Sequence, residues 1–376
     1  MDKKKIATNL GLLLVSLVIC VILLEVIVRI LIVGQAGFVL CAYEEDHVAG
    51  YRLQAGFETS YVPGSREYEH LVKTNSRGER GDDFGISGAE TVILGVGDSF
   101  AFGLGVDEEE TYLRLLEKSL REKGKSVVAV NAAVNGYSTE QELDLMEEYL
   151  EKYDVDLVVI GFFSANDVYG NLENKFRYEI VEGCLQTKPV EGTRSESIVQ
   201  GMRNFLSNNF KSYGFFAERL RAVPVLRELL MGLGLMQGKR APPHLQSMQN
   251  PPDDFMETAW VATEAEFERA QAIAESHNVR VVFLDIPSNF QIEDGLREQA
   301  LGTYGVPVEE YEFDFPEKKL REILRGKDNI IFIDTVQDFR QSTEKTYYNK
   351  DPHWTVAGHE LAAQILEEEI LERKLI

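Results

Sequence analysis

The chain has 376 residues, of which 44% are hydrophobic and 27% charged, a composition typical of a folded globular protein rather than a disordered one. Its 62 acidic residues outnumber the 39 Lys and Arg, which gives a formal net charge of -23. Such a charge argues against a nucleic-acid partner, because nucleic acids bind to basic surfaces. It gives no indication of the oligomeric state.

The first 39 residues are predicted to anchor the protein in a membrane. An apolar run extends from Leu10 to Val33, and its only charged residues are Glu25 and Arg29. As a helix, this run is long enough to cross a hydrocarbon core of about 30 Å. Glu25 and Arg29 stand four residues apart with the acid first, which is the better order for an ion pair within a helix. We therefore expect residues 1–39 to form a single-pass transmembrane helix.

The charges before this run predict its orientation. Lys3, Lys4 and Lys5 favour a cytoplasmic N-terminus, which leaves the rest of the chain outside the cytoplasm. A cleaved signal peptide is the alternative, but no convincing small-x-small cleavage site follows before "GQAG". Cys41 and Cys184 would pair in an exported protein or remain two free thiols, and the sequence leaves both interpretations open.

Residues 40–88 are rich in turns and short strand patterns, and from about residue 89 apolar strands alternate with amphipathic helices. The expected strands are Thr91–Gly97, Ser126–Asn131, Asp156–Phe163, Arg280–Ile286 and Asn329–Asp334. The expected helices are Glu108–Lys123, Ser138–Lys152, Glu257–Asn278, Glu317–Leu324 and Val356–Lys374. This alternation predicts that residues 89–376 form a flavodoxin-like, doubly wound α/β domain with a parallel sheet. Residues 168–256 break the alternation and are predicted to be an insertion with a helical pair around Ile198–Leu235.

The stretch "TVILGVGDSFAFGLG" (Thr91–Gly105) runs from a strand into a glycine-rich turn. It does not fit a phosphate-binding loop, because the lysine of a Walker motif is missing and the third glycine position of the dinucleotide fingerprint falls on Phe100. A strand that ends in Gly-Asp-Ser instead places Ser99 at the carboxyl edge of the sheet, where open α/β folds bind their ligands. Ser99 is therefore a candidate nucleophile.

A candidate base and its carboxylate partner lie near the other end of the chain, in "YYNKDPHWTVAGHE". Pro352 disfavours helical geometry at Asp351, so Asp351 and His353 are expected to lie in an extended loop before the last helix. There His353 could accept the serine proton while Asp351 holds the imidazole in the required tautomer. This prediction depends on His353 lying within hydrogen-bonding distance of Ser99.

Two further residues follow strands at the same edge of the predicted sheet. Gly136 comes after the second strand, in "VNAAVNGYSTEQE", and Asn166 after the third, in "GFFSANDV". The backbone N–H of Gly136 and the side-chain amide of Asn166 could both donate to a developing oxyanion. We therefore expect them to contribute to an oxyanion hole.

These residues stand in four blocks that resemble those of the SGNH/GDSL hydrolases. The blocks are "GDS" (Gly97–Ser99), "NAAVNG" (Asn131–Gly136), "SAND" (Ser164–Asp167) and "DPH" (Asp351–His353). The resemblance implies a serine esterase that works through an acyl-enzyme, with neither cofactor nor metal. It implies that Ser99 is the nucleophile, His353 the base and Asp351 its partner. It also implies an oxyanion hole formed by the Ser99 N–H, Gly136 and Asn166, and a structural role for Asp98. Ala133 and Ser164 stand where the family commonly has glycine.

Two shorter likenesses bear on the cellular setting. The segment "VKTNSRGERG" (Val72–Gly81) is similar to the N-S-x-G-x-R segment of membrane-anchored bacterial members. "DPHW" is similar to the D-x-H-W of members that move acetyl groups on exopolysaccharides. The resemblance thus implies an esterase outside the bacterial inner membrane that acts on acyl esters, in particular O-acetyl esters of a cell-surface glycan.

Three alternatives remain beside this interpretation. A polysaccharide O-acetyltransferase would use the same triad, with a sugar hydroxyl in place of water as the acceptor. A non-catalytic glycan-binding or assembly factor would need no triad. A metal site built from Asp351, His353, His359 and Glu360 lacks the spacing of an H-E-x-x-H motif. The other histidines form no cluster in sequence and are assigned to surface or loop positions: His47, His70, His244 and His277.

Overall fold

The computed structural model describes residues 3–28, 40–83, 90–172, 175, 178–188, 210, 212–213, 243–304 and 307–376. The chain divides into two compact units. One contains Met1–Gly37 and Pro189–Arg240, and the other contains Phe38–Lys188 and Ala241–Ile376. The helical pair expected around Ile198–Leu235 lies outside the described residues.

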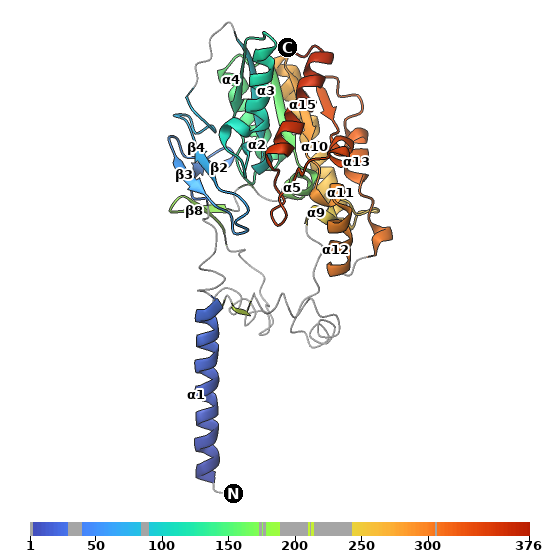
Figure 1. Ribbon diagram of the computed structural model, residues 1–376. Coiled ribbons are helices and arrows are strands. Elements are labelled where there is room, and N and C mark those ends of the chain that lie inside the picture. Colours follow the sequence, from blue (N-terminus) through green and yellow to red (C-terminus); the bar gives the residue numbers. More distant parts are fainter. Residues whose placement is uncertain are drawn as a thin grey trace. The chain divides into compact units, whose positions relative to one another are not determined.

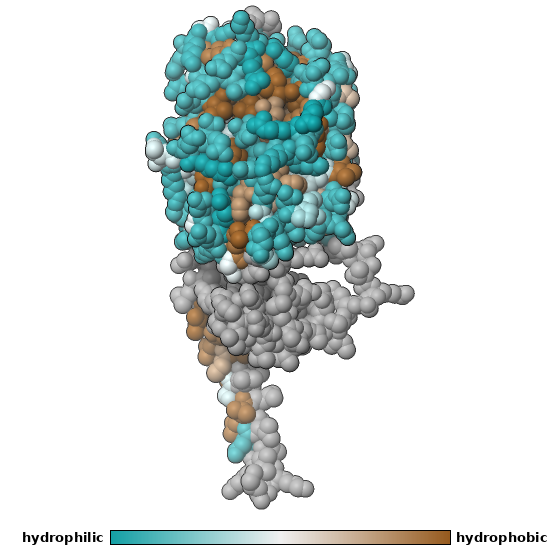
Figure 2. All heavy atoms as spheres, turned by 90° about the vertical axis from the view of Figure 1, so that its right-hand side faces the viewer, coloured by the Kyte–Doolittle hydropathy of each residue, from teal (hydrophilic) through white to brown (hydrophobic). Residues whose placement is uncertain are grey.

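The first unit contains helix α1, Lys3–Val28 (Figure 1). Its exposed apolar side chains include Leu12, Leu13, Val15, Ile19 and Ile22, and Figure 2 shows apolar residues on the helix surface. Glu25 is buried and accepts hydrogen bonds from the backbone N–H and the hydroxyl of Ser212, at 2.9 and 2.7 Å. Its expected partner Arg29 lies outside the described residues. Within the described ranges, no helix has both the length and the apolar content needed to cross a bilayer, so the expected transmembrane helix is not found there. The expected span ran on to Val33, which is also outside these ranges.

A five-stranded parallel sheet forms the centre of the second unit, as predicted (Figure 1). Its strands in spatial order are β11 (Ile330–Ile333), β10 (Arg280–Asp285), β7 (Leu157–Phe162), β5 (Thr91–Gly97) and β6 (Val127–Asn131). Every residue of β6 and β7 is buried, which explains why these segments are continuous apolar runs. The register pairs Gly97 with Gly161, so the carboxyl ends of β5 and β7 meet at one edge.

Helices cover both faces of this sheet. On one face α3 (Tyr112–Glu122) packs against α15 (Val356–Glu372), and on the other α4 (Thr139–Lys152) packs against α10 (Asp254–His277) (Figure 1). The other α-helices of this unit among the described residues are α2 (Ser99–Phe102), α5 (Ser164–Gly170), α9 (Pro243–Gln246), α11 (Asn289–Ile292), α12 (Asp294–Tyr304), α13 (Phe315–Ile323) and α14 (Val336–Gln341). Local capping explains several boundaries. The Thr111 side chain caps α3, so the helix predicted from Glu108 starts four residues later, at Tyr112, after a short 3₁₀ turn at Glu108–Glu110.

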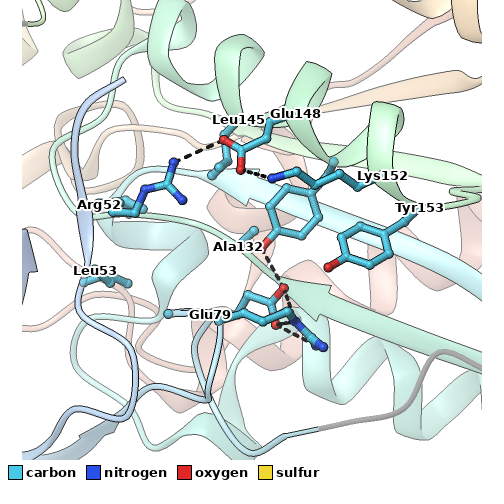
Figure 3. A pocket seen from close by; sticks show the side chains of 12 residues that line it. Arg52, Leu53, Glu79, Ala132, Leu145, Glu148, Lys152 and Tyr153 are labelled. Atoms are coloured by element: carbon cyan, nitrogen blue, oxygen red, sulfur yellow. Dashed lines mark hydrogen bonds and ion pairs between the residues drawn. The ribbon is translucent and has the colours of Figure 1, made fainter. Parts of the chain in front are cut away.

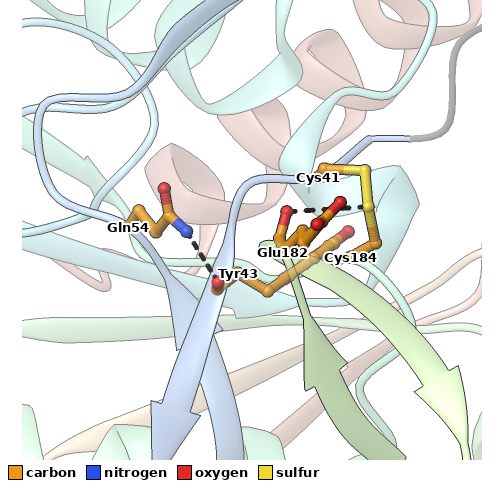
Figure 4. The surroundings of a disulfide bond; sticks show 5 residues. All are labelled: Cys41, Tyr43, Gln54, Glu182 and Cys184. Atoms are coloured by element: carbon orange, nitrogen blue, oxygen red, sulfur yellow. Dashed lines mark hydrogen bonds between the residues drawn. A yellow bond between two sulfur atoms is a disulfide. The ribbon is translucent and has the colours of Figure 1, made fainter.

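Three antiparallel hairpins complete the second unit. They are β1 (Tyr43–Asp46) with β2 (Gly50–Leu53), β3 (Glu58–Tyr61) with β4 (His70–Lys73), and β8 (Tyr178–Val181) with β9 (Cys184–Thr187). A disulfide between Cys41 and Cys184 links the segment before β1 to β9, and the Gln54 amide donates to the Tyr43 carbonyl beside it (Figure 4). The question that the sequence left open is thus answered in favour of pairing. This bond ties the start of the segment 40–83 to the β8–β9 hairpin.

Candidate active site

The turn after β5 places Ser99 at the carboxyl edge of the sheet. Gly97 has φ 152°, and a Cβ there would lie 2.5 Å from the Ala101 Cβ and 3.2 Å from the Gly161 carbonyl oxygen. Only glycine therefore allows the chain to turn from β5 into α2 at this point. Asp98 caps the new helix, because its Oδ1 accepts the Phe100 N–H at 2.8 Å. This cap is the structural role that the sequence predicted for Asp98.

The imidazole of His353 lies between Ser99 and Asp351. His353 Nε2 is 2.8 Å from Ser99 Oγ, and Nδ1 is hydrogen-bonded to Asp351 Oδ1. The Asp351 Oδ1 also accepts the backbone N–H of His353, at 3.1 Å. Burial raises the pKa of Asp351, but the hydrogen bonds and charge of His353 more than offset this and hold the pKa below its ordinary value. The predicted contact between two residues 254 positions apart is therefore present.

Gly136 and Asn166 are brought together beside the turn that carries Ser99. The Asn166 Nδ2 donates to Asp98 Oδ2 at 3.1 Å and to the carbonyl of Tyr137, the residue after Gly136, at 3.0 Å. Gly136 is exposed and has φ 79°, a left-handed conformation that favours glycine. Both amide hydrogens of Asn166 thus have acceptors, so an oxyanion bound here would take the place of one of these two acceptors.

Replacing Asn166 with alanine is expected to lower kcat for ester hydrolysis by about 10²- to 10³-fold, the usual effect of losing one oxyanion donor. KM should change little, because the donor acts mainly on the transition state. Asn171→Ala is the matched control, because Asn171 follows the same helix and bonds to Thr139 and Thr263 instead. Steady-state kinetics on both variants would measure the difference. Equal rates for the two variants would remove Asn166 from the oxyanion hole.

Three buried carboxyl groups lie behind the nucleophile: Asp98, Glu142 and Asp167. Burial raises the pKa of Asp98 to about 6. Burial, and then the charges of Asp167 and Asp98, raise the pKa of Glu142 well above its ordinary value. Asp167 accepts the Phe163 N–H at 2.6 Å, whereas neither carboxyl oxygen of Glu142 has a hydrogen-bond partner in the described part of the chain. Sequence analysis missed Glu142, because nothing in its helical pattern marks it as buried beside two other acids.

Glu142→Gln is expected to stabilise the protein at pH 8 and not at pH 4. Below the ordinary pKa of 4.5, Glu142 is protonated in both the folded and the unfolded chain, so its titration has no effect on stability. Above it, only the unfolded chain releases the proton, and stability falls by up to about 1.4 kcal/mol per pH unit until the folded group ionises. Glutamine removes this loss. Urea unfolding at both pH values would measure it, with the exposed Glu151→Gln on the same helix as control. A variant destabilised equally at both pH values would contradict the assignment.

Arg80, in the "NSRGER" segment, is buried against the helix that begins with Ser99. Its guanidinium donates to the carbonyl oxygens of Phe102, Gly103, Leu71 and Val106, at 3.1, 3.4, 3.0 and 2.9 Å. It also lies 4.5 Å from the centre of the Phe102 ring. Burial lowers its pKa to about 10, so it stays a cation at neutral pH. The likeness at residues 72–81 was the only sequence signal for this contact.

The cavity shown in Figure 3 does not contain the Ser99–His353 pair. It has a volume of about 230 Å³ and is lined by residues of β2, the "NSRGER" turn and α4. Arg52 and Lys152 pair with Glu148, while Arg77 and Tyr149 bond to Glu79. Each charged side chain of this lining therefore has a partner of opposite charge within it.

The alternative metal site does not form. His359 Nδ1 accepts the backbone N–H of Tyr112 at 3.3 Å, and Glu360 is exposed on α15. Within the described residues, no group of three or more His, Cys, Asp or Glu side chains could hold a metal ion. The assignment of His70 to a surface or loop position is wrong, because His70 is a buried residue of β4, with its ring 5.4 Å from Tyr61 and 5.6 Å from Tyr68.

Comparison with known proteins adds a family match. The sequence profile of the GDSL-like lipase/acylhydrolase family matches residues 96–306. Similar solved structures include TesA, with 12% identity, coverage of 76% of this chain and 100% of that chain, and a TM-score of 0.38. The psychrotrophic esterase EstA from Pseudoalteromonas sp. has 13% identity, coverage of 76% and 99%, and a TM-score of 0.39. The acetyl xylan esterase AlAXEase has 13% identity, coverage of 74% and 99%, and a TM-score of 0.40. No curated protein sequence matches the chain.

Proposed function

Because the chain belongs to the GDSL-like lipase/acylhydrolase family, it is a serine ester hydrolase, and we propose that Ser99, His353 and Asp351 are its catalytic triad. The observation that carries this proposal is the unbroken line of contacts from Asp351 through His353 to Ser99. Asp351 accepts at the Nδ1 side of the imidazole, which leaves Nε2 free of its proton and able to accept from the serine hydroxyl.

In the first half-reaction, His353 takes the Ser99 proton as Oγ attacks the ester carbonyl carbon. The carbonyl oxygen becomes an oxyanion, to which the N–H groups of Ser99 and Gly136 and the amide of Asn166 donate. Collapse of this species breaks the bond to the alcohol, which leaves with the proton from His353. Water then attacks the acyl-enzyme with His353 again as base, and the acid is released from Ser99.

We propose that the substrate is an acyl ester, in particular an O-acetyl ester of a cell-surface glycan. The support for this class is the likeness of "DPHW" to the D-x-H-W of members that move acetyl groups on exopolysaccharides. The same triad would transfer the acetyl group if a sugar hydroxyl replaced water at the second step. The two activities differ only in which acceptor reaches the acyl-enzyme.

One assay separates these activities. The full-length protein is incubated with p-nitrophenyl acetate, and separately with acetylated and deacetylated oligosaccharides together, with Ser99→Ala as the blank. Release of free acetate without acetylation of the deacetylated oligosaccharide would support the esterase. Acetyl groups on that oligosaccharide would support the transferase. Turnover of p-nitrophenyl acetate alone would overturn the glycan substrate and leave the triad standing. Glycan binding without turnover of any ester would overturn the triad in favour of the binding role.

We further propose that the protein is held at the bacterial inner membrane by residues 1–39, with the second unit, which contains the five-stranded sheet, outside the cytoplasm. The N-terminal lysines, the apolar run to Val33 and the exposed apolar side chains of α1 support the anchor. The Cys41–Cys184 disulfide supports the location, because disulfides persist in oxidising compartments. The protein should remain with membranes after a carbonate wash and be digested by protease added to spheroplasts. Recovery in the soluble fraction, or protection from the protease, would overturn this location.

A further inference from the structure

The connection between β3 and β4 lies against the loop that carries Asp351. The carboxylate of Glu67, in this connection, accepts three consecutive backbone N–H groups of that loop. Asn349 donates to Oε1 at 2.8 Å, while Lys350 and Asp351 donate to Oε2 at 2.6 and 3.0 Å. A single side chain thus fixes the backbone of the loop up to and including Asp351.

The next residue, Tyr68, reaches the Asp351 side chain itself. Its hydroxyl donates to Asp351 Oδ2 at 3.1 Å, on the oxygen that does not face His353. The Tyr68 ring packs 4.5 Å from Tyr348, whose hydroxyl donates to the Gly105 carbonyl at 2.8 Å, shortly after α2. Both oxygens of Asp351 are therefore engaged, one by His353 and one by Tyr68.

The chemistry of this contact favours an ionised Asp351. Burial and the Asp351 charge raise the pKa of Tyr68 far above its ordinary value, so the hydroxyl remains a donor throughout the working pH range. A donor on a carboxylate stabilises the anion and fixes the rotation of the carboxyl group. That rotation decides whether Oδ1 points at His353.

We infer that Tyr68 and Glu67, two residues of the β3–β4 connection, are positioning residues for Asp351 and His353. This inference rests on the triad proposed above. It extends the site to a segment that precedes the stretch matched by the family profile, residues 96–306. Glu67 holds the loop backbone, and Tyr68 holds the carboxylate in the orientation that His353 needs.

Tyr68→Phe tests the inference with a change of one hydroxyl group. With p-nitrophenyl acetate, kcat should fall about tenfold, the effect expected for one hydrogen bond to a charged group, while KM stays within about twofold. Tyr61→Phe is the matched control. Tyr61 lies in the same hairpin and packs against Tyr68 and His70, but the described contacts include no hydrogen bond from it to Asp351. The control should keep its full rate.

The pH profile separates positioning from simple packing. Titratable groups around Asp351 are Tyr61, Tyr68, Tyr348, Glu67 and His353. The titratable groups that interact electrostatically with His353 also include Asp98, His70, His244 and His359. Loss of the Tyr68 hydroxyl removes a hydrogen bond that stabilises the Asp351 carboxylate, so Asp351 becomes easier to protonate. This moves the acid limb of the kcat/KM profile of Tyr68→Phe to higher pH.

A second pair of variants tests the Glu67 contact. Glu67→Ala frees three backbone N–H groups and should lower kcat at least as much as Tyr68→Phe. Glu69→Ala is the control, since Glu69 instead accepts from Ser60 within the hairpin. Circular dichroism and thermal melting should show that all four variants are folded, and the hydrogen-bonded Nδ1 proton of His353 should shift in the NMR spectra of the Tyr68 and Glu67 variants only.

The possible failures are distinguishable. Unchanged kcat and an unmoved acid limb in Tyr68→Phe would overturn the inference while leaving the triad intact. A lower kcat in Tyr61→Phe as well, with no shift of the acid limb, would reduce Tyr68 to a packing role. If Ser99→Ala kept full activity, the triad itself would be wrong. The Nδ1 proton would then still report whether Tyr68 orients Asp351, because that measurement needs no turnover.

Discussion

Ser99→Ala is expected to reduce ester hydrolysis by about 10⁴- to 10⁶-fold, because it removes the one protein atom that bonds to the acyl group in the proposed mechanism. His353→Ala should cost about as much, since the serine hydroxyl is a poor nucleophile without a base at Nε2. The double variant should lose little more than either single variant, because the two residues act as a unit. The measurement is kcat with p-nitrophenyl acetate for the full-length protein.

The control for Ser99 is Ser164→Ala. Ser164 is a buried serine that follows β7 at the same sheet edge, and its Oγ has no hydrogen-bond partner in the described part of the chain. The chemical change is identical, but Ser164 has no contact with His353 among the described hydrogen bonds. Its rate should stay within a few-fold of the wild type. Comparable activity of Ser99→Ala and Ser164→Ala would end the case for Ser99 as nucleophile.

The sheet and the placement of the site were predictable because both follow from local pattern. Continuous apolar runs such as Leu157–Phe162 are buried on both faces of the sheet, and parallel strands bring their carboxyl ends to one edge. Ser99, Gly136 and Asn166 each follow such a strand, so their meeting required only the correct fold class. His353 was placed by the loop that Pro352 imposes before α15.

The supports of the site were not predictable, because they depend on contacts between distant segments. The Tyr68 and Asp351 side chains are 283 residues apart, and no periodicity or spacing links them. In the sequence, Arg80 was noted only as part of the segment similar to N-S-x-G-x-R. Its structural role comes from four backbone carbonyl oxygens that accept hydrogen bonds from its guanidinium. His70 looked like a loop histidine, but the rings of Tyr61 and Tyr68 enclose it. Each of these residues belongs to a segment whose own pattern is that of an exposed hairpin.

Asp351→Asn should reduce kcat by about 10⁴-fold, a loss far larger than one hydrogen bond explains. The oxygen that now accepts from His353 Nδ1 would compete with an amide NH₂, which can only donate. When the NH₂ faces His353, the imidazole carries its proton on Nε2 and cannot accept the proton of Ser99. The loss therefore comes from the wrong tautomer, and Asp338→Asn, at an exposed position on α14, should show none of it.

Asp98→Asn decides between the two acids that lie near Ser99. Asp98 accepts from Phe100 and Asn166, and the described hydrogen bonds include none between Asp98 and the imidazole, so its replacement should affect mainly the oxyanion donor and the helix cap. We expect its kcat to fall by about 10- to 100-fold. A 10⁴-fold loss in Asp98→Asn, with Asp351→Asn nearly unimpaired, would transfer the role of the acid to Asp98. The hydrogen bond from His353 Nδ1 to Asp351 argues for the opposite result, because an imidazole has one nitrogen for its base function and one for its partner.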